Sequence, residues 1–438
     1  MTCGKGYKLL IGKSSEKYFV GYDLGNRYCQ ISVCPWGGRN PETLPSVAGS
    51  ENYNIPTVLL KRKGANQWLF GREACSRAAE SEGIRVDNLL ELAKAGEKVL
   101  IDGSEFDPVA LLTLFIKRSF SLLAGPGSGD KIGALMFTCS DLGQAEVEVL
   151  RRVIPGLGLK TREIYFQRYE DSIYYYNLYQ EAQTWNHQVL VCDYREDTLR
   201  IYCMERNKRT TPTVVFIGEQ AYPFQNLREI PEEEYLREPI FGKMDQEFLE
   251  ILEELCSGQL ISSVYLLGEG FGDEWLKESL RFLCRNRRVF QGNNLFSKGA
   301  CYGVIERESA SDAGKSHVFL GNEKLKSNIG MKVLRRGEDS YFALLDAGVN
   351  WYEVHREVDF FLEEGTEFHV IVTPLTGKDV QSVIIRLEGL PERPPGTTRL
   401  HLQVDMTEEN RVRLQIEDRG FGELFPASDM SWTEILEV

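Results

Sequence analysis

Short apolar runs, separated by polar turns, recur along the first three hundred residues. Residues 18–22 are aromatic and apolar, and residues 28–33 alternate between apolar and polar side chains, so the two segments predict paired strands around a tight turn. The continuous apolar run at 132–139 is typical of a strand covered on both faces. Helical spacing at 108–123 and 144–153 lies on either side of this run. The alternation of strands and helices predicts an α/β fold.

The turn between the first two strands carries the first candidate chemistry. It contains Asp23, Gly25, Asn26 and Arg27. Gly25 can take a positive φ, and the exposed N–H groups of such a turn form a small concavity that binds anions. Asp23, at the end of the strand, is placed to hold a cation. An ordinary hairpin with an Asx-type turn has the same residues, so both interpretations stay open.

A second strand–turn–strand unit follows about 170 residues after the first. Its strands are expected at 187–193 and 198–204, with Asp193 at the corner between them. Two such units predict an internally duplicated fold.

A glycine turn follows the next strand, which is expected at 261–267. Gly268 and Gly270 stand between this strand and a helix expected at 274–284. A strand, a glycine turn and a helix form a usual place for a nucleotide, although glycines that only tighten the turn give the same pattern. Upstream of it, the acidic segment 219–237 is expected to be a loop and 244–256 a helix.

The periodicity changes beyond a polar stretch at 306–316, which is expected to be a linker between domains. Short alternating segments, separated by turn residues, then predict a β-sandwich over 317–438. Its strands are expected at 317–320, 331–334, 341–345, 368–373, 383–387, 400–404 and 412–416.

Composition narrows the classes of partner. The net charge is −14, from 65 acidic and 51 basic residues, which argues against a nucleic-acid or anionic-membrane surface. The ten cysteines are scattered without a CxxC pair, and the five histidines lack ligand spacing. Because the sequence also lacks a secretory leader and an apolar run of about 18 residues, it predicts a cytoplasmic protein with reduced thiols.

Three motifs resemble those of the actin–hexokinase–heat-shock ATPase superfamily. Gly21-Tyr-Asp-Leu-Gly25-Asn-Arg is similar to its first phosphate motif, GIDLGTT. Val191-Cys-Asp193 stands where the second phosphate motif, DLGGGT, begins, and Leu266-Leu-Gly268-Glu-Gly270 resembles the adenosine motif, LVGGS. Within the superfamily the chain resembles the DnaK-like, seventy-kilodalton heat-shock chaperones, because 387–396 and 416–422 are similar to the end of their peptide-binding sandwich. The resemblance covers about residues 18–425.

The resemblance implies a two-lobed, actin-like ATPase fold of the duplicated ribonuclease H-like kind, followed by an all-β sandwich. The nucleotide-binding domain would span 1–305, with lobes at about 1–184 and 185–305. ATP or ADP would sit between the lobes with Mg²⁺.

It also implies roles for individual residues. Asp23 and Asp193 would orient the waters bound to Mg²⁺ and act in catalysis, and Lys94 is the nearest candidate for the catalytic lysine of the superfamily. Gly25, with Asn26 and Arg27, is expected to hold the phosphates, together with Arg195. Gly268 and Gly270 are expected to lie under the adenosine.

Departures from the motifs point to weak or absent hydrolysis. The second phosphate loop, 193–198, has no glycine, and Glu196 and Asp197 would repel a phosphate, which Arg195 would partly offset. Asn26 and Arg27 replace the two threonines of the first motif. The glutamate of the EPTAA motif has no counterpart, and the surroundings of Lys94 do not match. The residues after Gly422 are too few for the helical lid of the chaperones.

Two functional hypotheses follow. In the first, Mg²⁺-nucleotide binding between the lobes controls a sandwich that accepts an extended peptide or a protein client, with no nucleic-acid or membrane partner. In the second, the chain is a non-catalytic pseudo-ATPase that keeps the fold as a scaffold or interaction module. A sugar or acetate kinase of the same superfamily is disfavoured, because the C-terminal sandwich resembles that of the chaperones.

Overall fold

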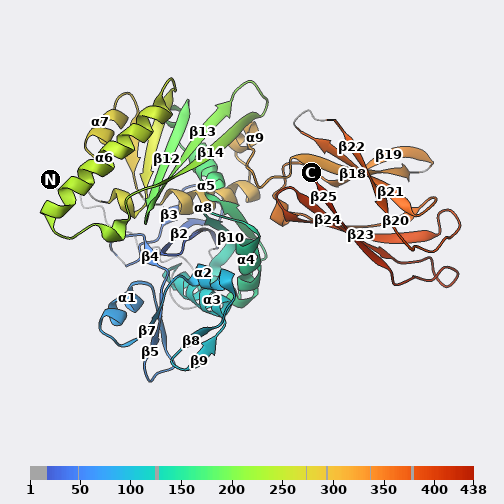
Figure 1. Cartoon of the computed structure of the whole chain (residues 1–438), viewed down its shortest axis with the longest axis horizontal. Coiled ribbons are helices and arrows are strands. Elements are labelled where there is room, and N and C mark those ends of the chain that lie inside the picture. The colour runs from blue at the N-terminus through green and yellow to red at the C-terminus, as the bar shows by residue number, and fades with distance from the viewer. Residues whose placement is uncertain are drawn as a thin grey trace. The chain divides into compact units, whose positions relative to one another are not determined.

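The computed structural model describes residues 17–47, 49–123, 128–272, 274–292, 294–335, 337–375 and 379–438. The chain divides into two compact units after Phe319 (Figure 1). The first unit contains mixed sheets and helices, and the second contains only antiparallel sheets. The predicted order of an α/β region before an all-β region is therefore confirmed.

The first sheet of the α/β unit is built around a hairpin and two parallel neighbours. Its strand order is β11-β10-β1-β2-β3, with β4 also paired to β2. β1 pairs antiparallel with β2 and parallel with β10, which in turn pairs parallel with β11. The strands are β1 (Tyr18–Leu24), β2 (Tyr28–Pro35), β3 (Glu42–Thr43), β4 (Ile55–Pro56), β10 (Ile132–Cys139) and β11 (Ile164–Arg168).

The second sheet repeats this arrangement. Its order is β16-β15-β12-β13-β14-β17, and β12 pairs antiparallel with β13 and parallel with β15. β12 thus holds the position that β1 holds in the first sheet, so Asp23 and Asp193 lie on equivalent strands. The strands are β12 (Gln188–Arg195), β13 (Thr198–Asn207), β14 (Thr213–Pro223), β15 (Ile261–Leu267), β16 (Arg288–Gln291) and β17 (His317–Phe319).

Helices and two small sheets complete this unit. The helices are α1 (Gly71–Ala79), α2 (Leu89–Ala95), α3 (Pro108–Ser119), α4 (Gln144–Leu157), α5 (Tyr169–Leu178), α6 (Glu234–Cys256), α7 (Glu278–Leu283), α8 (Leu295–Glu308) and α9 (Asp312–Ser316). The small sheets are β6-β5-β7, of Trp68–Phe70, Leu59–Arg62 and Gly83–Val86, and β8-β9, of Val99–Ile101 and Ser104–Phe106. None of the helices in the described residues is long and apolar enough to cross a membrane.

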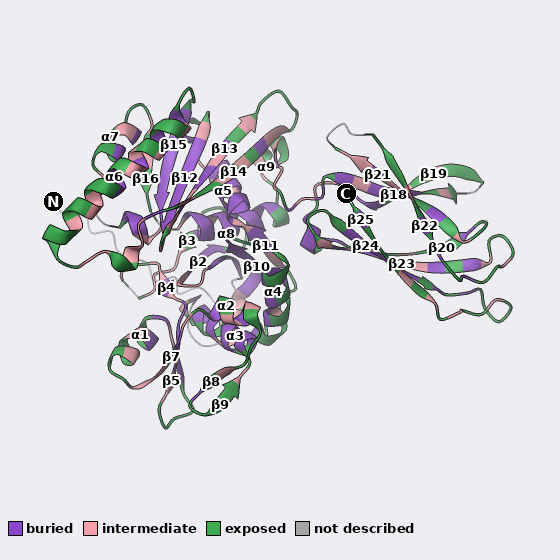
Figure 2. Ribbon diagram, viewed as in Figure 1, coloured by how far each residue is buried: buried purple, intermediate pink, exposed green. Residues whose placement is uncertain are grey.

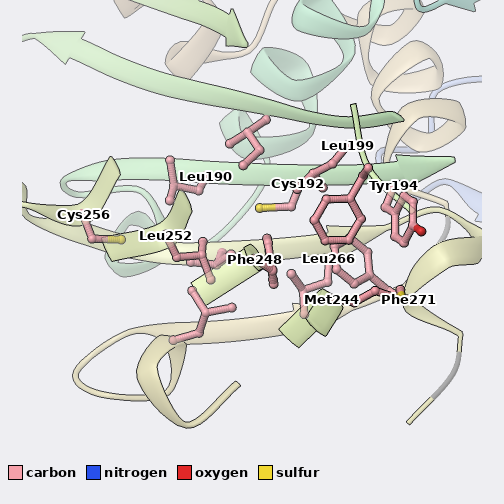
Figure 3. Close-up of a cluster of buried hydrophobic side chains, with 14 of the residues drawn as sticks. Leu190, Cys192, Tyr194, Leu199, Met244, Phe248, Leu252, Cys256, Leu266 and Phe271 are labelled. Carbon is pink, nitrogen blue, oxygen red and sulfur yellow. The ribbon is translucent and has the colours of Figure 1, made fainter. Parts of the chain in front are cut away.

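The second sheet packs on helix α6 through an apolar core (Figure 3). Met244, Phe248, Leu252 and Cys256 recur at every fourth position of α6, so they share one face, and all four are buried. Tyr194 of β12 belongs to the same core. The core therefore reaches the strand end that carries Asp193.

Helices α5 and α8 lie close together at the centre of this unit, where buried residues concentrate (Figure 2). A Cβ on Gly299 of α8 would lie 2.1 Å from the carbonyl oxygen of Ser172 in α5. A Cβ on Gly21 of β1 would lie equally close to the carbonyl oxygen of Ser297. These glycines let α8 pack directly on the backbone of α5 and β1, which fixes the strand that carries Asp23.

The second unit consists of two four-stranded antiparallel sheets, β19-β18-β21-β22 and β20-β23-β24-β25. Buried and exposed positions alternate along β23 and β24, as expected for strands with one face in a core. The strands are β18 (Ser327–Arg335), β19 (Glu338–Leu345), β20 (His355–Leu362), β21 (Glu367–Pro374), β22 (Gln381–Arg386), β23 (Thr398–Glu408), β24 (Arg411–Asp418) and β25 (Ser431–Glu437).

Several expectations from the sequence are wrong in detail. The stretch 306–316, expected as a linker, contains the end of α8 and all of α9. The strand expected at 317–320 is β17, which pairs with β14 of the α/β unit rather than with the later strands. The expected loop at 219–237 contains the end of β14 and the first turn of α6. Helix α6 continues through Pro239, so it begins ten residues before the predicted start at 244.

Candidate functional site

Two aspartates at the ends of equivalent strands share one arginine. Asp23 and Asp193 are each 2% exposed. Arg195 Nε donates a hydrogen bond of 2.9 Å to Oδ1 of Asp193, and Arg195 Nη2 lies 3.9 Å from Oδ2 of Asp23. Because Arg195 follows Asp193 by two residues on β12, both side chains leave the same face of the strand. One guanidinium thus connects the hairpin of the first sheet with that of the second.

Aromatic rings fix the position of this guanidinium. Arg195 Nη1 donates to the hydroxyl of Tyr169 at 3.0 Å, and that hydroxyl donates to Oδ1 of Asp23 at 2.7 Å. The rings of Tyr169 and Phe296 stack with centroids 3.7 Å apart. The guanidinium carbon of Arg195 lies 5.3 and 5.6 Å from these centroids, within the range of a cation–π interaction.

Burial and the neighbouring charges shift the pKa values of Asp23 and Arg195. Burial raises the pKa of Asp23 to about 6, against the opposing effects of Arg195 and of the Tyr169 hydrogen bond. Burial alone would lower the pKa of Arg195, but the neighbouring charges, that of Asp193 above all, raise it well above its usual range. Arg195 is therefore a permanent cation, whereas Asp23 can still take up a proton in mildly acidic solution.

The cluster does not fit Mg²⁺. In the superfamily that the chain resembles, Asp23 and Asp193 would hold the waters bound to Mg²⁺. Here both carboxylates interact with Arg195 instead, so a divalent cation would be repelled by a fixed guanidinium. Among the described residues, no group of three or more His, Cys, Asp and Glu side chains is arranged to hold a metal ion. No catalytic step through Mg²⁺ follows from this geometry.

The glycine turn after β15 is explained by the packing of Tyr194. Gly268 has a φ of +91°, and a Cβ there would lie 2.2 Å from the carbonyl oxygen of Tyr194 and 3.0 Å from Oδ1 of Asp193. A Cβ on Gly270 would lie 2.0 Å from the ring of Tyr194. The two glycines make room for protein atoms, which is the tight-turn alternative left open by the sequence.

The turn between β1 and β2 reaches across to the second sheet. Gly25 is needed for its shape, since a Cβ there would lie 2.6 Å from the carbonyl oxygen of Tyr28. Asn26 accepts a hydrogen bond of 3.3 Å from the backbone N–H of Glu91 in α2. Arg27 Nη1 donates to Glu269 at 2.9 Å, and Arg27 Nε lies 3.4 Å from Glu196. Arg27 is therefore a second ion-pair connection between the two hairpins.

Lys94 lies apart from these residues. Its Nζ is 2.6 Å from Glu146 of α4 and 3.2 Å from Glu91, and it does not line the cavity beside Arg195. The structure thus brings together Asp23, Asp193 and Arg195 with the two turns. Lys94 lies outside this cluster and is connected to it through Glu91, whose backbone N–H donates to Asn26. Its role as a catalytic lysine has no support in these contacts.

A cavity of about 530 Å³ opens in front of Arg195. Charged side chains of both signs line it: Arg27, Arg195, Arg200 and Arg228, with Glu91, Asp193, Glu196, Asp197 and Glu269. Each arginine already has an acidic partner; Arg200, for example, donates to Glu219 at 2.6 Å, and Arg228 lies 3.4 Å from Glu196. A polyphosphate would have to displace these acids, so the cavity offers it little net attraction.

Tyr169, Phe296, Glu269 and Arg228 were not anticipated from the sequence. Tyr169 and Phe296 are far from Arg195 in the sequence, and they approach it only because α5 and α8 pack together. One signal was available: an arginine two residues after an aspartate in a strand lies on the same face, which predicts their ion pair.

The comparisons with known proteins concern both units. Residues 40–322 match the C-terminal part of a family of unknown function, DUF5716. The chain belongs to the DUF5716 family. Residues 324–438 match a second domain of unknown function, DUF8552, and no curated protein matches the chain. The range matched to DUF5716 contains Asp193, Arg195 and Gly268, whereas Asp23 precedes it.

Proposed function

We propose that this DUF5716 member is a pseudo-ATPase: a non-catalytic scaffold with an actin-like, two-lobed fold followed by a β-sandwich. The equal order of strands in the two mixed sheets supports the duplicated ribonuclease H-like arrangement. The two four-stranded antiparallel sheets with alternating burial support the sandwich, in the manner of the DnaK-like chaperones that the sequence resembles.

The observation that carries the proposal is Arg195 between Asp23 and Asp193. In the superfamily that the chain resembles, these aspartates would serve a metal-bound nucleotide. Here the guanidinium supplies a positive charge from within the chain, so it offsets the repulsion between the two carboxylates without a ligand. The contact of Arg195 with Asp23 and Asp193, which connects the two hairpins, would then persist without ATP. Such a contact suits a scaffold rather than a nucleotide-driven switch.

The partner of such a scaffold would bind to the second unit. Strands β19, β22, β20 and β25 lie at the ends of the two sheet orders, so each has one side without a neighbouring strand in the described residues. An extended peptide or a segment of a client protein can add to such an edge through main-chain hydrogen bonds.

Calorimetric titration of the full chain with Mg-ATP and with Mg-ADP tests the proposal, with Asp23→Ala as the comparison. We expect no Mg²⁺-dependent heat for either protein, and no phosphate release from ATP. Saturable, Mg²⁺-dependent binding that Asp23→Ala abolishes would instead support the first hypothesis, in which ATP or ADP controls the sandwich.

A further inference from the structure

A second cavity, of about 510 Å³, adjoins the first at Arg27 in the same unit. The turn after β1, strand β4, helix α1, the end of β7 and the short helix Leu227–Glu229 contribute to its lining. It shares five lining residues with the cavity in front of Arg195: Asn26, Arg27, Tyr28, Asn88 and Arg228. None of the residues expected to bind a nucleotide, other than those of the first turn, lines it.

The charges of this second cavity are predominantly positive. Arg27, Arg85 and Arg228 line it together with one acid, Asp87. The acids Asp193, Glu196 and Asp197, which line the first cavity, are not part of this lining. Glu196 and Glu269, which pair with Arg27 and Arg228, also line only the first of these two cavities, so an anion in the second cavity would not have to displace them.

Two of the arginines have donors to spare. Arg85 uses Nε and Nη2 to bind Asp87, at 2.9 and 2.6 Å, and its Nη1 has no partner among the described residues. Arg228 is 65% exposed at the side chain, and its ion-pair contact in the described residues is Nη2 to Glu196 at 3.4 Å. An incoming anion can therefore bind both guanidinium groups without breaking the Arg85–Asp87 pair.

The remaining wall of the cavity is partly apolar. Tyr28, Pro56, Val58 and Cys75 form the apolar part, and Asn26 and Asn88 complete the wall. Val58 is 4% exposed, so it belongs to a fixed core, and the guanidinium of Arg27 lies 5.7 Å from the ring centroid of Tyr28. An aromatic ring on the ligand can pack against this apolar part and bury apolar surface there, which inorganic phosphate cannot do.

We propose that this cavity binds an aromatic phosphate monoester, with the ring against Tyr28 and Pro56 and the phosphate between Arg85 and Arg228. Arg27 and Arg228 are paired with acids outside this lining, so the cavity attracts an anion through free guanidinium donors rather than through a large net charge. A phosphate monoester presents three strong acceptor oxygens to these donors, whereas a carboxylate presents two. Binding requires neither Mg²⁺ nor ATP, and is thus independent of the proposed pseudo-ATPase role.

Calorimetric titration of the full chain with phenyl phosphate, without metal, tests the proposal. We expect saturable binding that is tighter than that of inorganic phosphate, and no binding of benzyl alcohol. Arg85→Gln and Arg228→Gln should each weaken phenyl phosphate about tenfold, the loss expected for a charge-assisted hydrogen bond. Arg281→Gln is the matched control: this exposed arginine of α7 pairs with Glu278 away from both cavities, so its replacement should leave the affinity unchanged.

A Tyr28→Leu variant separates the ring from the charge. It should weaken phenyl phosphate and leave inorganic phosphate unaffected, because only the aryl group packs against the ring. The proposal is overturned if the unaltered chain shows no saturable binding, or if Arg85→Gln behaves like Arg281→Gln. Equal affinities for phenyl phosphate and inorganic phosphate would overturn the assignment of the apolar wall. Since no nucleotide or metal is present, these outcomes are distinct from failure of the pseudo-ATPase proposal.

Discussion

Arg195 contacts two buried carboxylates, so its removal would leave both Asp23 and Asp193 without a cationic partner among the residues that the structure describes. We expect Arg195→Gln to lower the free energy of unfolding by about 3 kcal/mol at pH 8, the lower end for breaking a buried ion pair. The lower end applies because the Arg195 side chain is 32% exposed. Urea denaturation of the variant and of Arg281→Gln, a surface control, measures the loss.

The same substitution should show a characteristic pH dependence. Burial already raises the pKa of Asp23 to about 6, and loss of Arg195 removes an effect that lowers it. For an acid with a raised folded pKa, stability is greatest in the protonated state and falls as the pH rises through that pKa. The destabilisation by Arg195→Gln should therefore be smaller at pH 5 than at pH 8. Equal losses at both values would contradict this account of the cluster.

Glu196 has a φ of +56°, a left-handed conformation that disfavours residues with a Cβ. Its ion pairs with Arg27 and Arg228, at 3.4 Å each, are partly exposed and contribute little. Both Glu196→Gly and Glu196→Ala remove these pairs, but only glycine relieves the backbone. We expect the glycine variant to be about 1 kcal/mol more stable than the alanine variant in thermal or urea unfolding.

At the scale of elements, the contact between α8 and α5 depends on the absence of a side chain at Gly299. Its Cβ would lie 2.1 Å from a backbone oxygen, which cannot move aside as a side chain could. Gly299→Ala should therefore destabilise the protein by about 1–3 kcal/mol or more. Gly242 of α6 is the control, because a Cβ there meets nothing within 4 Å. Gly242→Ala should be neutral or stabilising by about 0.5–1 kcal/mol in the same unfolding measurement.

The predictability of an element from the sequence depended on how completely it is buried. β10 and β15 have the predicted bounds, 132–139 and 261–267, because nearly every residue of each is buried and the apolar run coincides with the strand. β20 and β25 were missed, since exposed polar residues interrupt their apolar positions. At the site, the sequence identified Asp23, Asp193 and Arg195, and the spacing of Asp193 and Arg195 indicates that these two pair. The contacts of Arg195 with Asp23, Tyr169 and Phe296 could not be predicted, because they depend on the packing of elements that are distant in the sequence.

At the scale of the whole molecule, two buried aspartates, Asp418 of the second unit and Asp23 of the first, have opposite pKa shifts and therefore respond differently to acid. In the second unit, Arg393 donates two hydrogen bonds of 2.8 and 2.6 Å to Asp418, whose carboxylate also accepts from the N–H groups of Gly420 and Ser428. Against the effect of burial, these donors hold the pKa of Asp418 well below its usual range. Asp23 of the first unit has a raised pKa instead.

The sign of the acid response in the second unit follows from this shift. A carboxylate with a lowered folded pKa stabilises the fold above its unfolded pKa of about 3.9. This contribution is lost as the pH falls from the unfolded pKa to the folded pKa. Asp418→Asn lacks the ion pair at every pH, so it should cost about 3 kcal/mol at pH 7 and progressively less below about pH 4. Pulse proteolysis in urea, with fragments assigned by mass spectrometry, reports residues 320–438 separately from the first unit. The Arg393–Asp418 pair is not the source of acid sensitivity if the difference between the two proteins stays constant from pH 7 to pH 3.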